Sequence, residues 1–355
     1  MKALSKGIPL YLKFRDTFTI ATISPSRIQL RCGESEVFQL KGQSLSRIIP
    51  PILMMLDGSR AWPEVVKKLK PVAASRIIEN CIRKLFDTGI IIEEFEHKKY
   101  EKEIPGMFYR FLSNAQRNPQ DLLDLIGSAT IGIISQVDIG IPVLYSLQKH
   151  GFRNFKLFNT LVSGSDDNSL AVEDISTIKI MPFSIHELDE QSTSIDLLIS
   201  LLPHLDASQL DELNRQCVEN SIPWLPVDIY GGPFCSIGPL VIPGGGPCYE
   251  CFRSRLRSNL GNLADSYDEF LRFQRFSKIN VTSYGIIPAA VDMVSAAISL
   301  EAFKLISEIQ VPSSLGHNLM IDLMTLETKR DRVLQIPRCS ACFNSKKSSK
   351  GHWEL

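Results

Sequence analysis

Residues 129–140 read ATIGIISQVDIG, and they decide the fold of the larger part of the chain. The run from Ile131 to Ile134 is short and apolar, as in a strand that is buried on both faces of a sheet. Residues 142–150 then have the pattern of a helix, and Gly151 stands where a helix commonly ends. A buried strand followed by a helix is the repeating unit of a parallel sheet.

The same alternation continues toward the C-terminus. Further strands are expected at residues 155–158, 196–202 and 224–228, and a helix at residues 208–220. Short apolar strands joined by helices need cover on both faces of the sheet. We therefore expect an α/β fold with a doubly wound, mostly parallel sheet. The apolar stretch 286–300 is interrupted by Pro288 and Asp292, which favours a buried helix over a membrane span.

The first 95 residues are organised differently. Alternating runs at 27–32 and 36–40, preceded by Phe18 and Ile20, predict a three-stranded meander. Three helices are expected at residues 45–56, 63–69 and 73–87. This order predicts an N-terminal winged-helix α+β domain over residues 1–95. Residues 96–120 then form a linker, residues 121–343 the α/β domain, and residues 344–355 a polar tail.

Composition limits the class of protein. The chain has 355 residues, of which 44% are hydrophobic and 22% charged, as expected of a globular protein with two domains. Its 39 basic and 39 acidic residues balance, so no overall field attracts nucleic acid or membrane. Charges at Lys13, Arg15 and Asp16 interrupt the N-terminal segment before it reaches the length of a secretory signal, and a cytoplasmic location is expected.

Four of the eight cysteines form two CxxC motifs, Cys248 with Cys251 and Cys339 with Cys342. Two such motifs supply four soft ligands, the set of a closed tetrahedral zinc site. Because no coordination position stays open, we expect a structural zinc ion that clamps the C-terminal segment. Redox pairs and unliganded buried thiols are the alternatives. The other cysteines stand singly in apolar patterns and are expected to fill the cores.

The turn after the first sheet strand is where a nucleotide-binding fold places glycines against a phosphate. Here the turn and the end of the next strand carry Ser135, Gln136, Val137, Asp138, Ile139, Gly140 and Asn159. Only Gly140 is a glycine, branched side chains occupy the space for a phosphate, and Asp138 would repel it. The end of the second strand has Asn159 in place of an acidic residue that would hold a ribose. These residues predict a turn with the fold of a nucleotide-binding site that does not bind ATP.

Longer motifs carry a resemblance to a known family. They are DLLISLL at 196–202, SIPWLPVDIYGGPFCSIGPLVIPGGGPCYEC at 221–251, AAVDMVSAAISLEAFKLI at 289–306 and MIDLMTLETKRDRVLQIPRCSACF at 320–343. Over residues 105–343 the chain resembles the ThiF/MoeB superfamily of ubiquitin-activating-type adenylating enzymes. In active members the glycine turn binds ATP, and an Asp-rich turn after the DLLISLL strand binds magnesium. This sequence has Ser200 to Pro203 there, without a carboxylate, so the resemblance implies the fold and the zinc cysteines but an inactive site.

The N-terminal domain resembles the PqqD-like peptide clamp, or RiPP recognition element. The fusion of the two is similar to the ocin-ThiF-like partner proteins of azole-forming clusters. That resemblance implies a scaffold that binds the leader of a ribosomal precursor peptide and presents its core to a YcaO cyclodehydratase, which forms thiazolines or oxazolines. Microcin, heterocycloanthracin and thiopeptide pathways use such partners. It also implies a homodimer, without catalytic residues of its own.

The clamp has a physical rationale. An unpaired strand edge accepts an extended peptide by strand addition, and a neighbouring helix offers a groove for its side chains. Carried onto this sequence, the edge is Val37, Phe38, Gln39 and Leu40, and the helix presents Ile77, Cys81 and Lys84. Residues 60–84 contain seven basic and two acidic side chains, an excess that would attract an acidic leader.

Three alternatives stay open. The chain is an active ATP-dependent adenylating enzyme with divergent residues, or its N-terminal domain is a winged helix that binds DNA. Against DNA, Ile77, Ile78, Ile82 and Leu85 leave little polar face on the third helix for contact with bases. The glycines of residues 243–247, PGGGP, form either an anion-binding loop or a tight turn into the first CxxC motif.

Overall fold

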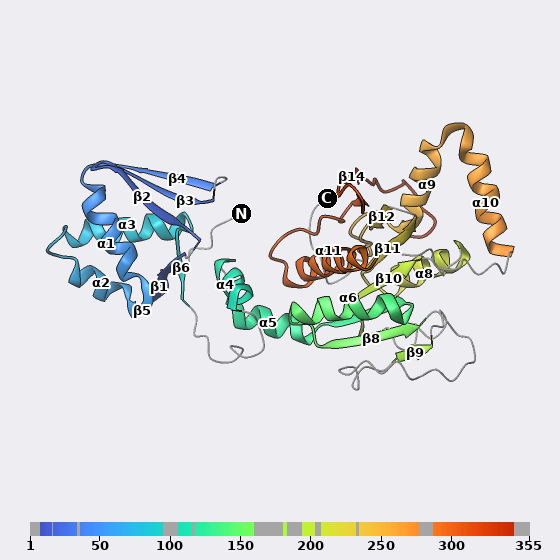
Figure 1. The fold of residues 1–355 in the computed structure, drawn as a ribbon, viewed down its shortest axis with the longest axis horizontal. Coiled ribbons are helices and arrows are strands. Elements are labelled where there is room, and N and C mark those ends of the chain that lie inside the picture. Colours follow the sequence, from blue (N-terminus) through green and yellow to red (C-terminus); the bar gives the residue numbers. More distant parts are fainter. Residues whose placement is uncertain are drawn as a thin grey trace. The chain divides into compact units, whose positions relative to one another are not determined.

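The computed structural model describes residues 8–15, 17–33, 36–94, 106–115, 118–159, 180–182, 194–202, 207–231, 234–276 and 287–343 (Figure 1). The chain divides into two compact units, residues 1–122 and 123–355. Each unit has a hydrophobic core of its own.

The N-terminal unit contains the expected meander. Strands β2 (Thr19–Ser24), β3 (Arg27–Cys32) and β4 (Glu36–Lys41) form an antiparallel sheet in the order β2-β3-β4. The chain reverses at residues 25–26, and again at Gly33, whose φ of +60° is a conformation that glycine adopts freely. Strand β4 pairs with β3 and, among the described residues, has no strand on its other side.

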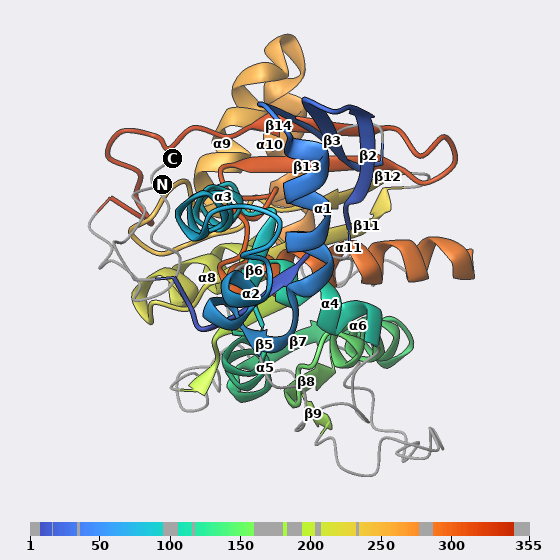
Figure 2. The same ribbon diagram turned by 90° about the vertical axis from the view of Figure 1, so that its left-hand side faces the viewer.

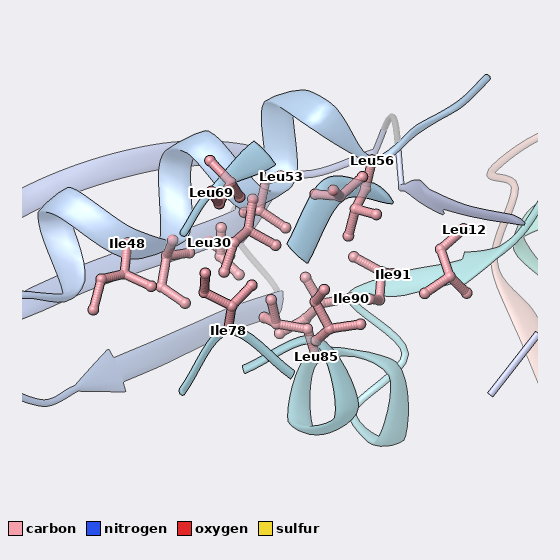
Figure 3. Packing of buried hydrophobic residues seen from close by; sticks show 14 of the residues in the cluster. Leu12, Leu30, Ile48, Leu53, Leu56, Leu69, Ile78, Leu85, Ile90 and Ile91 are labelled. Carbon is pink, nitrogen blue, oxygen red and sulfur yellow. The ribbon is translucent and has the colours of Figure 1, made fainter. Parts of the chain in front are cut away.

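Three helices follow within a few residues of their predicted bounds: α1 (Leu45–Met55), α2 (Trp62–Lys68) and α3 (Ser75–Asp87). Helix α2 has Pro63 in its first turn, where a backbone N–H has no partner within the helix, so the missing N–H of proline costs no hydrogen bond. In α3, Ile78, Ile82 and Leu85 recur at helical spacing and are buried. Figure 3 shows Ile78 and Leu85 in the core with Leu30 of β3 and Ile48, Leu53 and Leu56 of the α1 region.

A second small sheet in this unit was not expected from the sequence. It has the order β5-β1-β6, with β1 (Tyr11–Phe14), β5 (Asp57–Ala61) and β6 (Ile91–Glu93), and both of its pairings are antiparallel. Strands of three to five residues are too short to show a period of two in the sequence. Asp57 and Gly58, expected only to end α1, also begin β5.

The expected linker is not irregular throughout. Helix α4 (Gly106–Asn114) lies within residues 96–120, and α5 (Pro119–Ser128) begins there. Leu112 of α4 is fully buried, and Phe108 stacks on Phe111 with ring centroids 6.4 Å apart. These apolar contacts explain a helix where Pro105 and Gly106 favour irregular structure. Residues 95–105 lie outside the described residues.

The second unit is built on a sheet of eight strands. From one edge to the other these are β9 (Ile180–Pro182), β8 (Asn154–Asn159), β7 (Thr130–Ser135), β10 (Leu197–Leu202), β11 (Trp224–Gly231), β12 (Phe234–Ile237), β13 (His317–Asp322) and β14 (Thr328–Arg332). Neighbours from β9 to β11 are parallel, and those from β11 to β14 are antiparallel. The expected α/β fold with a mostly parallel sheet is confirmed, and an antiparallel extension is added to it.

Helices cover both faces of this sheet. Helix α6 (Val137–Lys149) packs beside α11 (Pro288–Ser307), and α8 (Ala207–Glu219) contributes Leu213 and Cys217 to the core on the other face (Figure 2). Helices α9 (Tyr249–Asn259) and α10 (Ala264–Phe276) follow the first CxxC motif. No helix in the described ranges is long and apolar enough to cross a membrane. Residues 344–355 lie outside these ranges.

Candidate functional site

The two CxxC motifs meet in the second unit. Cys248 is the residue before α9 and Cys251 lies in its first turn, whereas Cys339 and Cys342 lie in the turns that follow β14. All four side chains are buried, and their sulfur atoms lie within 4.8 Å of one another. Motifs that are 87 residues apart in the sequence therefore form one cluster, as expected.

The geometry of the cluster fits a tetrahedral metal ion. Sulfur atoms are 3.8 Å apart between Cys248 and Cys251, 3.7 Å between Cys248 and Cys339, and 3.7 Å between Cys251 and Cys342. A tetrahedron with metal–sulfur bonds of about 2.3 Å has edges of about 3.8 Å. Four soft ligands at this spacing, closed off from solvent, can hold an ion without an open position for substrate.

Three of the four sulfur atoms are also close to N–H groups. The side-chain amide of Asn214 lies 3.8 Å from the sulfur of Cys248, the backbone N–H of Ile336 lies 3.4 Å from that of Cys251, and Gln335 lies 3.4 Å from Cys342. Hydrogen bonds from the Cys248 and Cys251 thiols lower the pKa of Cys342 to about 3. A thiolate is the form of cysteine that binds metal.

Glycine-rich residues 243–247 make a turn that leads into the cluster. The backbone N–H of Gly245 donates to the carbonyl of Ile242 at 2.8 Å, and Gly244 has a φ of +68°. A proline followed by a glycine with positive φ is the pattern of a type II turn. Of the two alternatives for this segment, the structure has the tight turn.

Helix α9 is fixed to α8 by a partly buried ion pair between Arg253 and Asp211. The guanidinium of Arg253 is 2.5 Å from the carboxylate of Asp211 and 2.9 Å from that of Glu250, and its side chain is 12% exposed. Burial alone would lower the pKa of Arg253, but the two carboxylates raise it. This contact could not be predicted from the sequence, because the three residues lie on two helices and follow no motif.

The described part of the nucleotide-like turn forms the first turn of α6. Gln136 precedes α6, and its carbonyl accepts the backbone N–H groups of Ile139 and Gly140. A side chain at Gly140 would lie 2.3 Å from the hydroxyl oxygen of Ser135 and 2.9 Å from Leu157. The close approach of α6 to Ser135 of β7 and Leu157 of β8 therefore requires a glycine at position 140. The side chains of Val137, Asp138 and Asn159 lie outside the description.

In the N-terminal unit, strand β4 presents its predicted residues on two faces. Phe38 and Leu40 are half-buried against the core, and the ring of Phe38 meets that of Phe18 edge to face at 5.5 Å. Val37 and Gln39 are exposed on the opposite face of the sheet. An added strand would thus meet half-buried apolar side chains on one face, and exposed Val37 and Gln39 on the other.

Helix α3 places its predicted residues at different depths. Cys81 is half-buried against the same core as Phe38, and burial raises the pKa of its thiol. Ile77 is 48% exposed, a large value for an isoleucine on a helix whose other face packs in the core. Lys84 is also exposed. Cys81 and Phe38 share one core, whereas Ile77 and Lys84 extend into solvent.

The sequence argument against DNA is wrong for this helix. Ile78, Ile82 and Leu85 are turned inward, so they take no part of the outer face. That face exposes Arg76, Glu79, Asn80, Arg83, Lys84 and Asp87. Apart from Ile77, the exposed side of α3 is polar and carries both signs of charge. One further basic residue of this region, Arg60, is paired with Asp57 at 3.2 Å.

Comparison with known proteins shows similarity of fold. No family model and no curated protein matches the sequence. The structure of the heterocyclase TruD matches with a TM-score of 0.64 and 18% identity, over 94% of this chain and 43% of that one. Escherichia coli MccB with succinimide matches with a TM-score of 0.69 and 16% identity, over 94% and 99%. A complex of MccB with ATP gives 0.67 and 17% over the same shares.

The two comparisons differ in extent. The chain spans less than half of the heterocyclase but corresponds to nearly the whole of MccB. Identities below one in five show a shared fold, and the activity of a neighbour does not follow from the fold.

Proposed function

We propose that this chain binds the leader of a ribosomally made precursor peptide and presents that peptide to a separate cyclodehydratase. The observation that carries the proposal is the edge of β4, which no strand of the described residues covers, with Phe38 half-buried on β4 and Ile77 exposed on α3. An extended peptide on this edge would gain main-chain hydrogen bonds and an apolar contact. The fold shared with a heterocyclase and with MccB supports this class of pathway.

The proposed role of the second unit is that of a scaffold. The turn between β7 and α6 keeps one glycine, Gly140, which packs against Ser135 and Leu157 of the sheet, and we infer that adenylation is not the activity of this unit. The cysteine cluster holds a structural zinc ion, because four buried thiols at tetrahedral spacing match that metal. Such a scaffold acts by tethering: once the leader is bound, each modifiable side chain meets the partner enzyme at a raised effective concentration.

Binding of the leader is tested by fluorescence anisotropy. The probe is a fluorescein-labelled leader of any short Cys/Ser/Thr-rich peptide found to be encoded beside the gene, titrated with the full chain. Phe38→Asp and Ile77→Asp each place a charge in the proposed contact, and we expect a loss of affinity of about 30-fold or more. Thr22→Asp, on the opposite edge of the same sheet, is the matched control and should change affinity by less than about 3-fold.

Two results would overturn the proposal. One is the absence of saturable binding, and the other is equal loss in Phe38→Asp and Thr22→Asp. A labelled DNA duplex is titrated in parallel, because the outer face of α3 is polar. Tight duplex binding that weakens steeply with salt would instead identify a DNA-binding unit.

An adenylating enzyme is the second candidate, favoured by the fold shared with MccB in a complex with ATP. Pyrophosphate exchange with ATP, magnesium and the precursor peptide separates the two. The scaffold predicts no exchange above a protein-free control. Peptide-dependent exchange would assign the reaction to this chain.

A further inference from the structure

Helix α9 begins without a capping side chain of its own. Its N-cap residue is Cys248, whose side chain makes no capping hydrogen bond because its sulfur belongs to the cysteine cluster. The first backbone N–H groups of a helix need acceptors, and an N-cap side chain commonly supplies one. Here the acceptor comes from another helix: the side-chain oxygen of Asn214, on α8, accepts the N–H of Tyr249 at 3.0 Å.

The other end of the same amide faces the cluster. Only the oxygen of Asn214 can accept a hydrogen bond, so the contact with Tyr249 fixes the orientation of the amide. Its nitrogen then lies 3.8 Å from the sulfur of Cys248, within reach of an N–H to sulfur hydrogen bond. Asn214 is 3% exposed, and burying an amide is unfavourable unless both of its ends have partners.

The charge of a metal site explains why a donor is needed there. Four thiolates around a divalent ion leave two negative charges in a buried, largely apolar surrounding. N–H donors to the sulfur atoms spread this charge and orient the ligands. Cys251 receives such a donor from the backbone of Ile336, whereas Cys248 receives it from a side chain of another helix.

We propose that Asn214 is a positioning residue of the metal site, which caps α9 from α8 and donates to the Cys248 thiolate. The inference rests on the metal ion of the proposed function. It adds that metal affinity depends on α8, an element that contributes no ligand.

The experiment compares three variants of the full chain. Asn214→Asp keeps the oxygen that accepts from Tyr249 but loses the donor and adds a negative charge beside the thiolate. Asn214→Leu has a similar volume and loses both contacts. Gln216→Leu is the matched control, because Gln216 is another α8 amide that is 3% exposed and bonds to Glu212 rather than to a cysteine.

Metal release to a colorimetric chelator is followed after bound zinc has been measured by mass spectrometry. We expect Asn214→Asp and Asn214→Leu to weaken zinc affinity by about 10- to 100-fold, the range found for residues that support metal ligands, with Gln216→Leu within about 3-fold of the native chain. Cobalt-substituted protein gives a second readout. The thiolate-to-cobalt absorption band should shift in both Asn214 variants and stay unchanged in Gln216→Leu.

Each outcome has a separate meaning. Native behaviour of Asn214→Asp with a defect in Asn214→Leu would overturn the donor role and leave only the helix cap. Equal effects in Asn214→Asp and Gln216→Leu would overturn the proposal while the metal site stands. Absence of stoichiometric metal in the native chain would overturn both the role of Asn214 and the proposed zinc site. Leader binding would then still be tested by its own titration. If Asn214→Leu does not fold, Asn214→Asp carries the test.

Discussion

Strands β4 and β14 are both edge strands of the described sheets, but the side chains of β14 are mostly charged, whereas half of those of β4 are apolar. Residues 328–332 of β14 read TKRDR, with charges at four successive positions, whereas residues 36–41 of β4 read EVFQLK and expose Val37 to solvent. Charged residues on an edge strand oppose pairing with another chain, and apolar ones invite it. The comparison shows that charge opposes pairing at β14 more strongly than at β4.

Strand β14 is also anchored, by a contact from its middle residue and by the chain that follows it. Arg330 of β14 donates to the carbonyl of Ser313 at 3.1 Å, and the N–H of Ser313 donates to Glu301 of α11. The chain that leaves β14 enters the cysteine cluster within ten residues, at Cys339. Strand β4, by contrast, leads through residues 42–44 directly into α1. These contacts anchor β14, but among the described residues neither β14 nor β4 has a strand on its outer edge.

The largest expected effect comes from opening the cysteine cluster. Cys339→Ser removes one of four ligands beyond β14, and we expect loss of bound metal and a free energy of unfolding lower by on the order of 5 kcal/mol. Thermal unfolding with metal analysis measures both. Cys32→Ser, in the N-terminal unit, should keep the metal. Leader binding should survive in Cys339→Ser if β4 acts independently, and its loss would contradict the contrast between the edges.

A smaller effect is expected at Glu301, which is 4% exposed. Its carboxylate accepts hydrogen bonds from Ser313, from the backbone and hydroxyl of Ser314, and from Lys304 at 2.9 Å. Burial would raise the pKa of Glu301, but Lys304 and Ser314 outweigh it and hold this pKa below its usual value. Glu301→Gln should cost about 2 to 3 kcal/mol at pH 7, because the buried network loses its charge.

The pH dependence of this cost has a definite sign. A carboxyl whose pKa is lower in the folded state stabilises the protein above its unfolded value of about 4.3, and that contribution is lost as the pH falls through the folded value. The difference in urea stability between the native chain and Glu301→Gln should therefore shrink below about pH 4. Glu269→Gln, at an exposed position of α10, should show no such trend. A difference that grows in acid would contradict the assignment.

The contrast between the two edges is sharpened by making β14 apolar. Lys329 and Asp331 lie two residues apart on β14 and pair at 3.1 Å. Replacing both with valine removes the charges that oppose pairing, and we expect self-association stronger by about 10-fold. Light scattering during gel filtration measures it. The exchanged pair, Lys329→Asp with Asp331→Lys, keeps the edge charged and should elute as the native chain does.

Much of the fold, and the cysteine cluster, could be predicted from the sequence. Apolar runs and helical spacing predicted the β2 to β4 meander, α1 to α3 and the parallel strands, because these elements bury residues at a regular period. The two CxxC motifs predicted the cluster, because cysteine pairs at that spacing have few other uses. Strands β1, β5 and β6 were missed because three to five residues show no period.

Other parts depend on contacts between distant residues. Asn214 carries no motif, and its role follows only when α8 is placed against the start of α9. Glu301 lies in an apolar helix and would be a poor candidate for burial until the loop at 313–314 supplies its donors. Ile78 and Ile77 are identical in type, yet one is fully buried and the other 48% exposed. Neighbours in a sequence differ in this way because the core lies on one side of the helix.

The smallest expected effect lies at the bare edge, in the charge of α3. Lys84 is exposed, so its attraction for an acidic leader is screened by solvent and salt. Lys84→Ala should weaken binding of the labelled leader by about 3-fold at low ionic strength and by less at about 0.5 M salt, because the screening length shortens. Phe38→Asp should instead stay defective at both salt concentrations, since it removes a packed apolar contact. If Lys84→Ala proved more damaging than Phe38→Asp, the edge would be an electrostatic surface, and its contrast with the charged β14 would disappear.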